Sequence, residues 1–312
     1  MGPILQLLNP EMVLPRYDDL ADFWRAIASL PVDASSMRVA AIGGAQSDRL
    51  GFAFIAGYEA ALGRLVGAHR SAGIGALCVT ERAGNHPRAI ATALAPCGEQ
   101  LSLRGEKTFV TGGTLARQLF VLAVRDDQVA PGGQRSFALV AIEPSRAGVS
   151  IEALPPVGFV PEIPHALVRF DEVPIADGDC LPGDGYLGYV KPFRTMEDLH
   201  VSCAAAAYLL AVGRRFAWPS EMVLAWAEQL ERWLSFDVDL DDPLDPALHL
   251  RLAGALAIQA SLLRETAPLW CRVADDERGR FERDRAIFSV AERARQRRTA
   301  AALRALGVTL EI

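Results

Sequence analysis

The sequence predicts an α+β protein: an N-terminal helical part, a central antiparallel β-barrel-like domain and a C-terminal helical bundle. Three observations lead to this fold class. Apolar residues recur at helical spacing over residues 17–71, short runs bounded by Gly, Pro or charged turns follow, and helical periodicity returns from about Thr195. Helices segregated from strands in this way are typical of α+β folds and argue against alternating βαβ units.

The change of pattern along the chain sets the expected domain boundaries. We expect an N-terminal helical domain at residues 1–75, a central β domain at 76–192 and a C-terminal helical bundle at 193–312. The first domain should hold two or three helices. The strands of the second are indicated by the runs ALCVTE, EQLSLRGEKTFVTG, LFVLAVR, SFALVAIEP, VSIEAL and HALVRFDEVPI.

The C-terminal part is expected to contain a loop between two helices and a final amphipathic helix. The acidic stretch 236–249, with two prolines, is expected to be a loop between two helices. A final helix is expected from about Arg280 to Leu306. Its expected apolar stripe consists of Phe281, Ile287, Phe288, Val290, Ala294 and Leu303, under many arginines. Those arginines would form a solvated face with pairs such as Glu282 and Arg285, or alternatively hold a pyrophosphate.

Composition excludes several classes of protein. A formal net charge of −6 argues against a nucleic-acid surface. The five cysteines lie far apart with no CxxC pair, so we expect no metal site, no disulfide framework and a reduced cytoplasmic location. The start of the chain lacks the pattern of a signal peptide, and no run approaches the roughly 20 apolar residues of a membrane span. Gly-rich Rossmann and Walker motifs are absent as well.

Two central motifs resemble the acyl-CoA dehydrogenase family. The segment LCVTERAGNHPRAIATAL is similar to the family's T-E-P-x-x-G-S-D stretch, and LRGEKTFVTGG to its L-x-G-x-K-x-[WF]-[IV]-T-N-G stretch. Further along, HALVRFDEVPIADGDCLPGDGYLGY resembles the family's F-D-x-V-x-V-P turn and the Gly-rich entry to the next helix. The resemblance extends over about Leu77–Gly213 and implies a shortened, divergent member of that family.

The resemblance implies an FAD site. Thr80 would contact the flavin edge, Phe109 would cover the ring face, and Val110 and Thr111 would reach its polar edge. An isoalloxazine needs such a flat apolar face and a few polar groups. The alternation in KTFVT also suits any half-buried strand, and Lys107 is more often a structural charge than a ligand.

Four substitutions separate this sequence from the family pattern. The family's Asn is Gly112 here. Its acyl-CoA-contacting Ser and the Asp that follows it are His86 and Pro87. An acid at the position of the family's CoA-binding Arg, Asp198, would repel a phosphate-bearing ligand.

The catalytic base implied by the resemblance is Glu197. The family's base near the C-terminus has no counterpart in LRALGVTLEI, whereas TMEDLHVSCAAAA resembles the sequence that supplies the base in isovaleryl- and long-chain-type members. We expect Thr195 to cap this helix, Asp198 to complete the capping box three residues later, and Glu197 to lie in the first turn. The same pattern also suits simple helix stabilisation. His200, three residues on, would tune the base or be a packed residue.

The implied function is FAD-dependent α,β-dehydrogenation of an acyl-CoA or other acyl thioester by a soluble homodimer or homotetramer. Two alternatives stay open. One is a catalytically silent subunit that completes or regulates a partner, in a hetero-oligomer with a full-length homologue. The other is a flavin monooxygenase of the same fold, which needs no carboxylate base.

Overall fold

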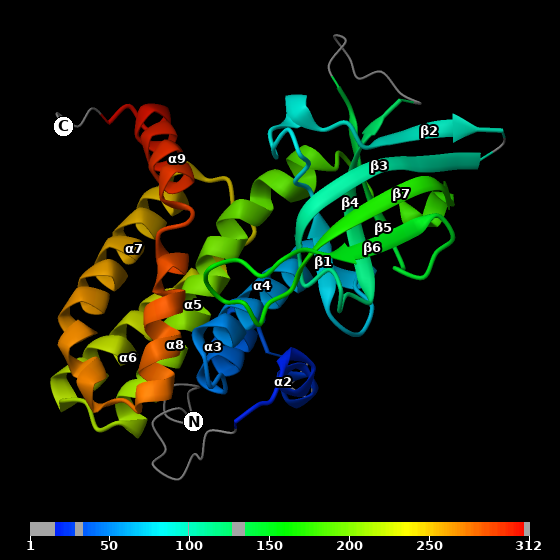
Figure 1. Cartoon of the computed structure of the whole chain (residues 1–312). Helices are drawn as coiled ribbons and strands as arrows, with labels where there is room; N and C mark the ends of the chain where they lie inside the picture. Colours follow the sequence, from blue (N-terminus) through cyan, green and yellow to red (C-terminus); the bar gives the residue numbers. More distant parts are fainter. Residues whose placement is uncertain (1–15, 29–33, 99, 127–134, 309–312) are drawn as a thin grey trace. The chain divides into compact units, whose positions relative to one another are not determined.

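The computed structural model describes residues 16–28, 34–98, 100–126 and 135–308 (Figure 1). The chain divides into two compact units. The helical unit holds the described residues of Met1–Ala61, Val157–Pro161 and Thr195–Ile312, and the β unit holds those of Leu62–Pro156 and Glu162–Arg194. Helices before and after a central sheet confirm the predicted α+β class.

Three of the described helices begin where a side chain accepts a free backbone N–H group. Asp19, Ser35 and Asp245 accept hydrogen bonds from backbone N–H groups two or three residues on, and so cap these three. The described helices are α2 (Leu20–Ile27), α3 (Ser36–Ala45), α4 (Leu50–Val66), α5 (Lys191–Arg215), α6 (Ser220–Leu234), α7 (Pro246–Thr266), α8 (Asp275–Asp284) and α9 (Glu292–Ala305).

The N-terminal and C-terminal helices share one hydrophobic core. Buried residues of α3 and α4 pack in the same cluster as Trp226 and Trp233 of α6 and Phe281 of α8. The backbones approach closely at glycines: a Cβ on Gly44 would lie 2.1 Å from the Ala204 carbonyl oxygen, and one on Gly57 2.6 Å from the Val201 Cα. These positions exclude any larger residue.

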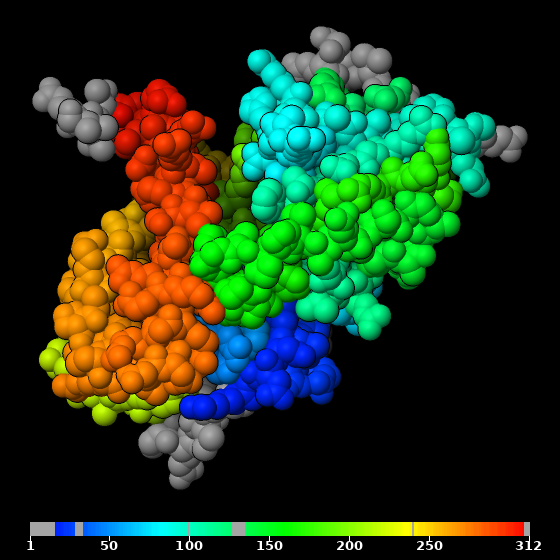
Figure 2. Space-filling model, viewed as in Figure 1, coloured from blue at the N-terminus to red at the C-terminus, as the bar shows by residue number. Residues whose placement is uncertain are grey.

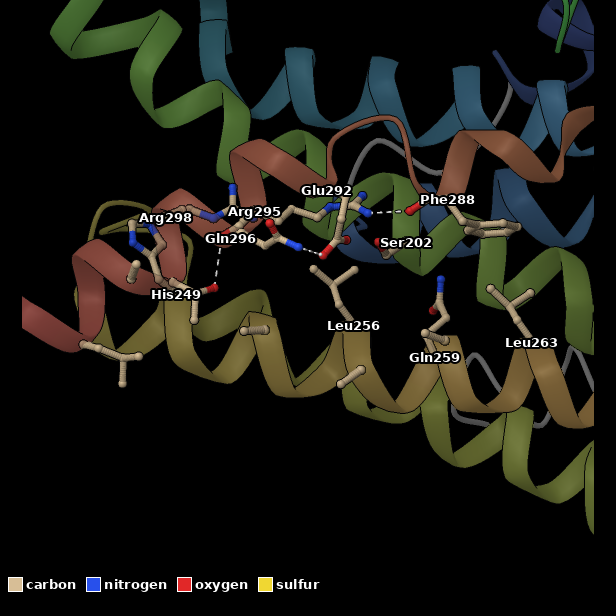
Figure 3. A pocket seen from close by; sticks show the side chains of 16 residues that line it. Ser202, His249, Leu256, Gln259, Leu263, Phe288, Glu292, Arg295, Gln296 and Arg298 are labelled. Atoms are coloured by element: carbon tan, nitrogen blue, oxygen red, sulfur yellow. Dashed lines mark hydrogen bonds between the residues drawn. The ribbon is translucent and has the colours of Figure 1, made fainter. Parts of the chain in front are cut away.

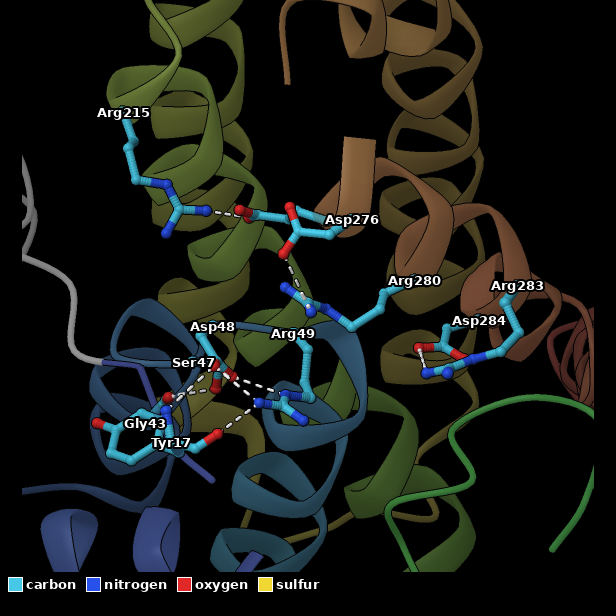
Figure 4. A network of polar contacts seen from close by, with 11 residues as sticks. Tyr17, Gly43, Ser47, Asp48, Arg49, Arg215, Asp276, Arg280, Arg283 and Asp284 are labelled. Atoms are coloured by element: carbon cyan, nitrogen blue, oxygen red, sulfur yellow. Dashed lines mark hydrogen bonds and ion pairs between the residues drawn. The ribbon is translucent and has the colours of Figure 1, made fainter. Parts of the chain in front are cut away.

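Buried charges are also paired inside this unit, in both its N-terminal and its C-terminal part (Figure 4). Asp48 accepts the Tyr17 backbone N–H at 3.2 Å and lies 2.9 Å from the Arg49 guanidinium. On α8, Glu277 pairs with Arg215 of α5. Burial raises the pKa of the Glu277 carboxyl, which the nearby guanidinium opposes.

The described residues of the β unit form a seven-stranded sheet. Its strands are β1 (Gly75–Cys78), β2 (Ala93–Cys97), β3 (Gln100–Thr111), β4 (Gln118–Arg125), β5 (Phe137–Ile142), β6 (Val149–Ala153) and β7 (His165–Ile175). Their order is β1-β4-β2-β3-β7-β6, with β5 on β4. The sheet is mixed, which corrects the antiparallel expectation: β4 runs parallel to both β1 and β2.

The C-terminal helices differ from the prediction in two places. A π-helical turn, Tyr186–Val190, leads directly into α5, so this helix begins before Thr195. The expected final helix is broken: α8 ends at Asp284, a 3₁₀ turn follows, and α9 starts at Glu292. Val290 lies in the break and is 65% exposed, so the expected stripe is not continuous. Figure 2 shows α8 and α9 (orange to red) at the surface of the helical unit.

Two described helices have the length and apolar composition of a membrane span, Leu50–His69 and Pro246–Arg272. The most apolar part of the first is 72% buried inside the protein, as in a core helix, and that of the second is 28% buried. No such segment was expected from the sequence. Among the described residues no group of three or more His, Cys, Asp or Glu could hold a metal ion, and none of the five cysteines is in a disulfide.

Candidate functional site

The segment that follows β1 is hydrogen-bonded to β3 beside the predicted flavin contacts. The Thr80 carbonyl accepts the Thr108 N–H at 2.8 Å, and the Thr80 side chain is half-buried. This bond brings Thr80 next to the Lys107–Thr111 stretch of β3. The two central motifs of the sequence therefore meet in one place in the β unit.

A buried ion pair lies under this junction. Lys107 is fully buried, and its Nζ lies 2.7 Å from the Glu81 Oε1 and 3.3 Å from the Val79 carbonyl oxygen. Glu81 also accepts the N–H groups of Ala91 at 2.7 Å and Thr92 at 3.0 Å. Burial alone would raise the pKa of the Glu81 carboxyl, but the ammonium and these two donors lower it. Lys107 is thus a structural charge, as expected.

Phe109 occupies a β-bulge. The register of β3 on β7 shifts between Lys107, opposite Val168, and Val110, opposite Ala166, so β3 carries one extra residue. Phe109 has a left-handed φ of 52° and is 57% exposed. The bulge therefore directs Lys107 into the core and Phe109 outward.

The residues after the bulge have two different environments. Val110 is buried against the sheet core, so only its backbone can meet a ligand. Thr111 is half-buried opposite His165, whose ring stands edge-on to Phe109 with 6.5 Å between centroids. Burial lowers the pKa of His165, which keeps its imidazole neutral at pH 7. His165 was not predicted from the sequence as a site residue. The only indication in the sequence is that it begins the strand run HALVRFDEVPI, which belongs to one of the family-like motifs.

The turn that follows explains one departure from the family pattern. Gly112 has a φ of 67° and donates its N–H to the Pro164 carbonyl at 2.8 Å. Gly and Asn are the residues that accept this left-handed conformation most readily, so Gly112 is compatible with a turn in which the family has Asn.

The departure at His86 and Pro87 lies beside a second tight turn. Glu81 and Gly84 pair across the turn, and Gly84 has a φ of 114°. The His86 Nδ1 accepts the Arg88 N–H at 3.2 Å and caps the short 3₁₀ helix Pro87–Ala89. His86 therefore replaces the family's Ser with a capping group.

Glu197 lies in the helical unit, in the second turn of α5. It is partly exposed, while its neighbours Met196 and Asp198 are buried. The expected cap is wrong, because the turn of Tyr186–Val190 precedes α5 and Asp184 accepts the N–H groups at its start. The positive end of the helix dipole consequently lies away from Glu197.

Asp198 and His200 have structural partners. Asp198 is bound by Arg295 at 2.8 Å and by Arg298, both on α9, instead of capping α5. His200 is fully buried: its Nδ1 lies 2.7 Å from the Met196 carbonyl oxygen and its Nε2 2.9 Å from the Ser36 Oγ. The carbonyl can only accept, so Nδ1 carries the proton and Nε2 accepts from Ser36. His200 is a packed residue.

Comparison with known proteins agrees with this architecture. Residues 76–173 match the family model described as acyl-CoA dehydrogenase, middle domain. The FAD complex of PigA matches with a TM-score of 0.67 at 14% identity, over 92% of this chain and 89% of that chain. Butyryl-CoA dehydrogenase from Megasphaera elsdenii matches with a TM-score of 0.65 at 13% identity, over 91% and 90%. An acyl-CoA dehydrogenase from Geobacillus kaustophilus gives 0.63 at 15%, over 90% and 89%.

By sequence, no curated protein matches the chain. At such low identities the solved structures establish the fold, and the family model identifies the central segment. The resemblance in the sequence is thereby confirmed: this chain has the acyl-CoA dehydrogenase fold, and its residues 76–173 match the middle-domain model of that family.

Proposed function

We propose that the protein is an FAD-dependent, acyl-CoA dehydrogenase-like oxidoreductase that forms a Cα=Cβ bond in an acyl thioester. The supporting observation is the bulge at Phe109. A left-handed φ in a non-Gly residue costs roughly 1–3 kcal/mol and is concentrated at functional sites. At Phe109 this strained backbone presents an aromatic ring at the surface of the β unit, inside the segment that matches the middle-domain model.

The residues around the bulge fit a flavin. An isoalloxazine requires an apolar face and a few polar groups at its edge. Phe109 supplies an exposed ring, the half-buried Thr80 and Thr111 supply hydroxyl groups, and His165 supplies a neutral imidazole. When bound, the flavin accepts a hydride from the β-carbon of the substrate. The neighbour PigA was solved as an FAD complex, which supports the same cofactor here.

Glu197 is the proposed base that removes the α-proton of the thioester. Its side chain is partly exposed on α5, as a group that meets a substrate must be. The adjacent Asp198 does not add a free negative charge, because two guanidinium groups bind it. That pairing also offsets the repulsion of a CoA phosphate that the sequence predicted from Asp198.

An absorbance spectrum of the purified protein, before and after adding FAD, tests the cofactor. We expect flavin bands that bleach anaerobically with an acyl-CoA. A colourless protein that takes up no FAD at micromolar levels refutes the proposal. Glu197→Gln should retain FAD but lose bleaching by at least ~100-fold, since a base contributes about 10²–10⁴ in rate. The control Glu221→Gln changes an exposed acid on α6 and should bleach normally. Normal bleaching in Glu197→Gln would exclude that residue as the base.

We further propose a soluble cytoplasmic homodimer or homotetramer, in keeping with five cysteines that form no disulfide. The domain boundaries at residues 75/76 and 192/193 remain part of this proposal. Light scattering after size exclusion measures the subunit count. A monomer that retains full activity would contradict the oligomeric part.

A further inference from the structure

Helices α7 and α9 line a half-open cavity of about 440 Å³ in the helical unit, with Ser202 of α5 at one side (Figure 3). This volume is within the range of about 300–1,000 Å³ for small-ligand sites. The lining residues extend along α7 from His249 to Leu263, roughly 20 Å at 1.5 Å per residue. The cavity is therefore elongated. Glu197 does not line it.

Small and aliphatic residues make up one side of the cavity. Seven apolar side chains of the two helices line it: Ala253, Leu256, Ala257, Ala260, Leu263, Ala300 and Leu303. The Phe288 ring lies at one end (Figure 3). An apolar surface of this kind suits an aliphatic chain.

Two buried polar groups in the cavity have unused hydrogen-bonding capacity. Gln259 is 3% exposed, and its Oε1 accepts the Trp233 Nε1–H at 2.6 Å. That bond fixes the amide, so its NH₂ group points into the cavity (Figure 3), where no described residue accepts from it. Ser202 is 4% exposed and also lines the cavity, and its hydroxyl has no hydrogen-bond partner among the described residues. Both donors are therefore open to a ligand in the cavity.

The charged groups around the cavity balance one another. Asp198 binds both Arg295 and Arg298 from behind. A second negative charge, Glu292, lines the cavity and accepts a hydrogen bond from Gln296 at 2.9 Å, so that two carboxylates balance the charge of two guanidinium groups. Burial lowers the pKa of His249, so its ring is neutral at pH 7. A charged ligand would find no uncompensated partner here.

We propose that this cavity binds a linear, uncharged aliphatic chain that bears one carbonyl group, such as a fatty amide or ester. The chain lies along the alanine and leucine walls. The carbonyl oxygen accepts hydrogen bonds from the Gln259 amide and the Ser202 hydroxyl. The site is separate from the one assigned to flavin and substrate, and its occupancy does not depend on FAD.

Isothermal titration of the full chain with octanamide tests the proposal. We expect saturable 1:1 binding, with or without added FAD, and octanoate should bind about tenfold more weakly, since its carboxylate loses its hydration opposite Glu292. Ser202→Ala should weaken octanamide binding about fivefold through loss of one hydrogen bond. Absence of saturable octanamide binding, or tighter binding of octanoate, would overturn the proposal.

Two leucine variants on α9 provide a matched pair. Ala300→Leu fills the cavity and should abolish measurable octanamide binding. Ala294→Leu, on an exposed position of the same helix, should leave the Kd within about twofold. Equal effects of the two variants contradict the assigned site. A change of oligomer size in Ala300→Leu with unchanged octanamide binding would identify the groove as an interface between copies, and would equally overturn the proposal.

Discussion

Replacing Phe109 by glycine should give a more stable protein than replacing it by alanine. In an ordinary strand the order is the opposite, because glycine is less stable than alanine by roughly 0.5–1 kcal/mol. The left-handed φ of 52° reverses it, since this region costs a non-Gly residue about 1–2 kcal/mol. Both variants lose the same ring, which is 57% exposed. With roughly 200 Å² for a whole side chain, that loss is about 2 kcal/mol for each.

Urea unfolding of the two variants measures the difference directly. We expect Phe109→Gly to exceed Phe109→Ala by about 1 kcal/mol in the free energy of unfolding. Thr108→Gly and Thr108→Ala, one residue earlier in β3, are the controls and should show the ordinary order. FAD affinity should fall by a similar factor of about 2–12 in both Phe109 variants, since both remove the aromatic contact. If Phe109→Gly is less stable than Phe109→Ala by the margin found at Thr108, the reasoning from the bulge is refuted.

Three further outcomes follow from the buried charges. Lys107→Met should lower the free energy of unfolding by about 3–5 kcal/mol, because it leaves the Glu81 carboxylate buried without its cation; a loss below 1 kcal/mol, as expected for the exposed Arg169→Met, would contradict this. The lowered pKa of the Glu81 carboxyl contributes stability that is complete above its unfolded pKa of about 4.3 and is lost as the pH falls through its folded pKa. In Glu81→Gln the free energy of unfolding should therefore change less steeply with pH in the acid range. An unchanged slope would count against this prediction. Asp198→Asn should lower the thermal midpoint, since two arginines of α9 lose their carboxylate, whereas Glu197→Gln should not; equal midpoints would show that the pairing is unimportant.

The strands were predictable where the alternation was regular. Six of the seven described strands lie within the runs expected from the sequence or begin one residue before them. The seventh, β2, was missed because Ala93–Cys97 contains Pro96 and small residues, and has no aromatic residue. Its parallel neighbour β4 is distant in sequence, and alternation gives no information about which strands pair.

The bulge at Phe109 shows why the site was only partly predictable. A regular strand would place Lys107, Phe109 and Thr111 on one face. The extra residue on β3 separates a buried Lys107 from an exposed Phe109, which no local pattern in KTFVT requires. The family motif indicated the right ring, but the backbone that exposes it depends on pairing with β7.

Long-range partners explain the errors on α5. Thr195 and Asp198 have the types and spacing of a capping pair, yet their contacts come from residues far along the chain. Thr195 lies 3.3 Å from His249, and Asp198 binds arginines 97 and 100 positions away. The true start of the helix depends on Asp184 and a π-helical turn, which has no clear sequence signature.

The close helix crossings at Gly44 and Gly57 have a consequence for synthesis on the ribosome. The partners of these glycines, Ala204 and Val201, emerge well over a hundred residues later, so α3 and α4 wait roughly 10–30 s at 5–20 residues per second before they can pack. The intervening β unit can fold during that interval. The nascent chain meanwhile exposes the apolar segment Leu50–Val66, which makes it a candidate for chaperone binding before its C-terminal helices arrive.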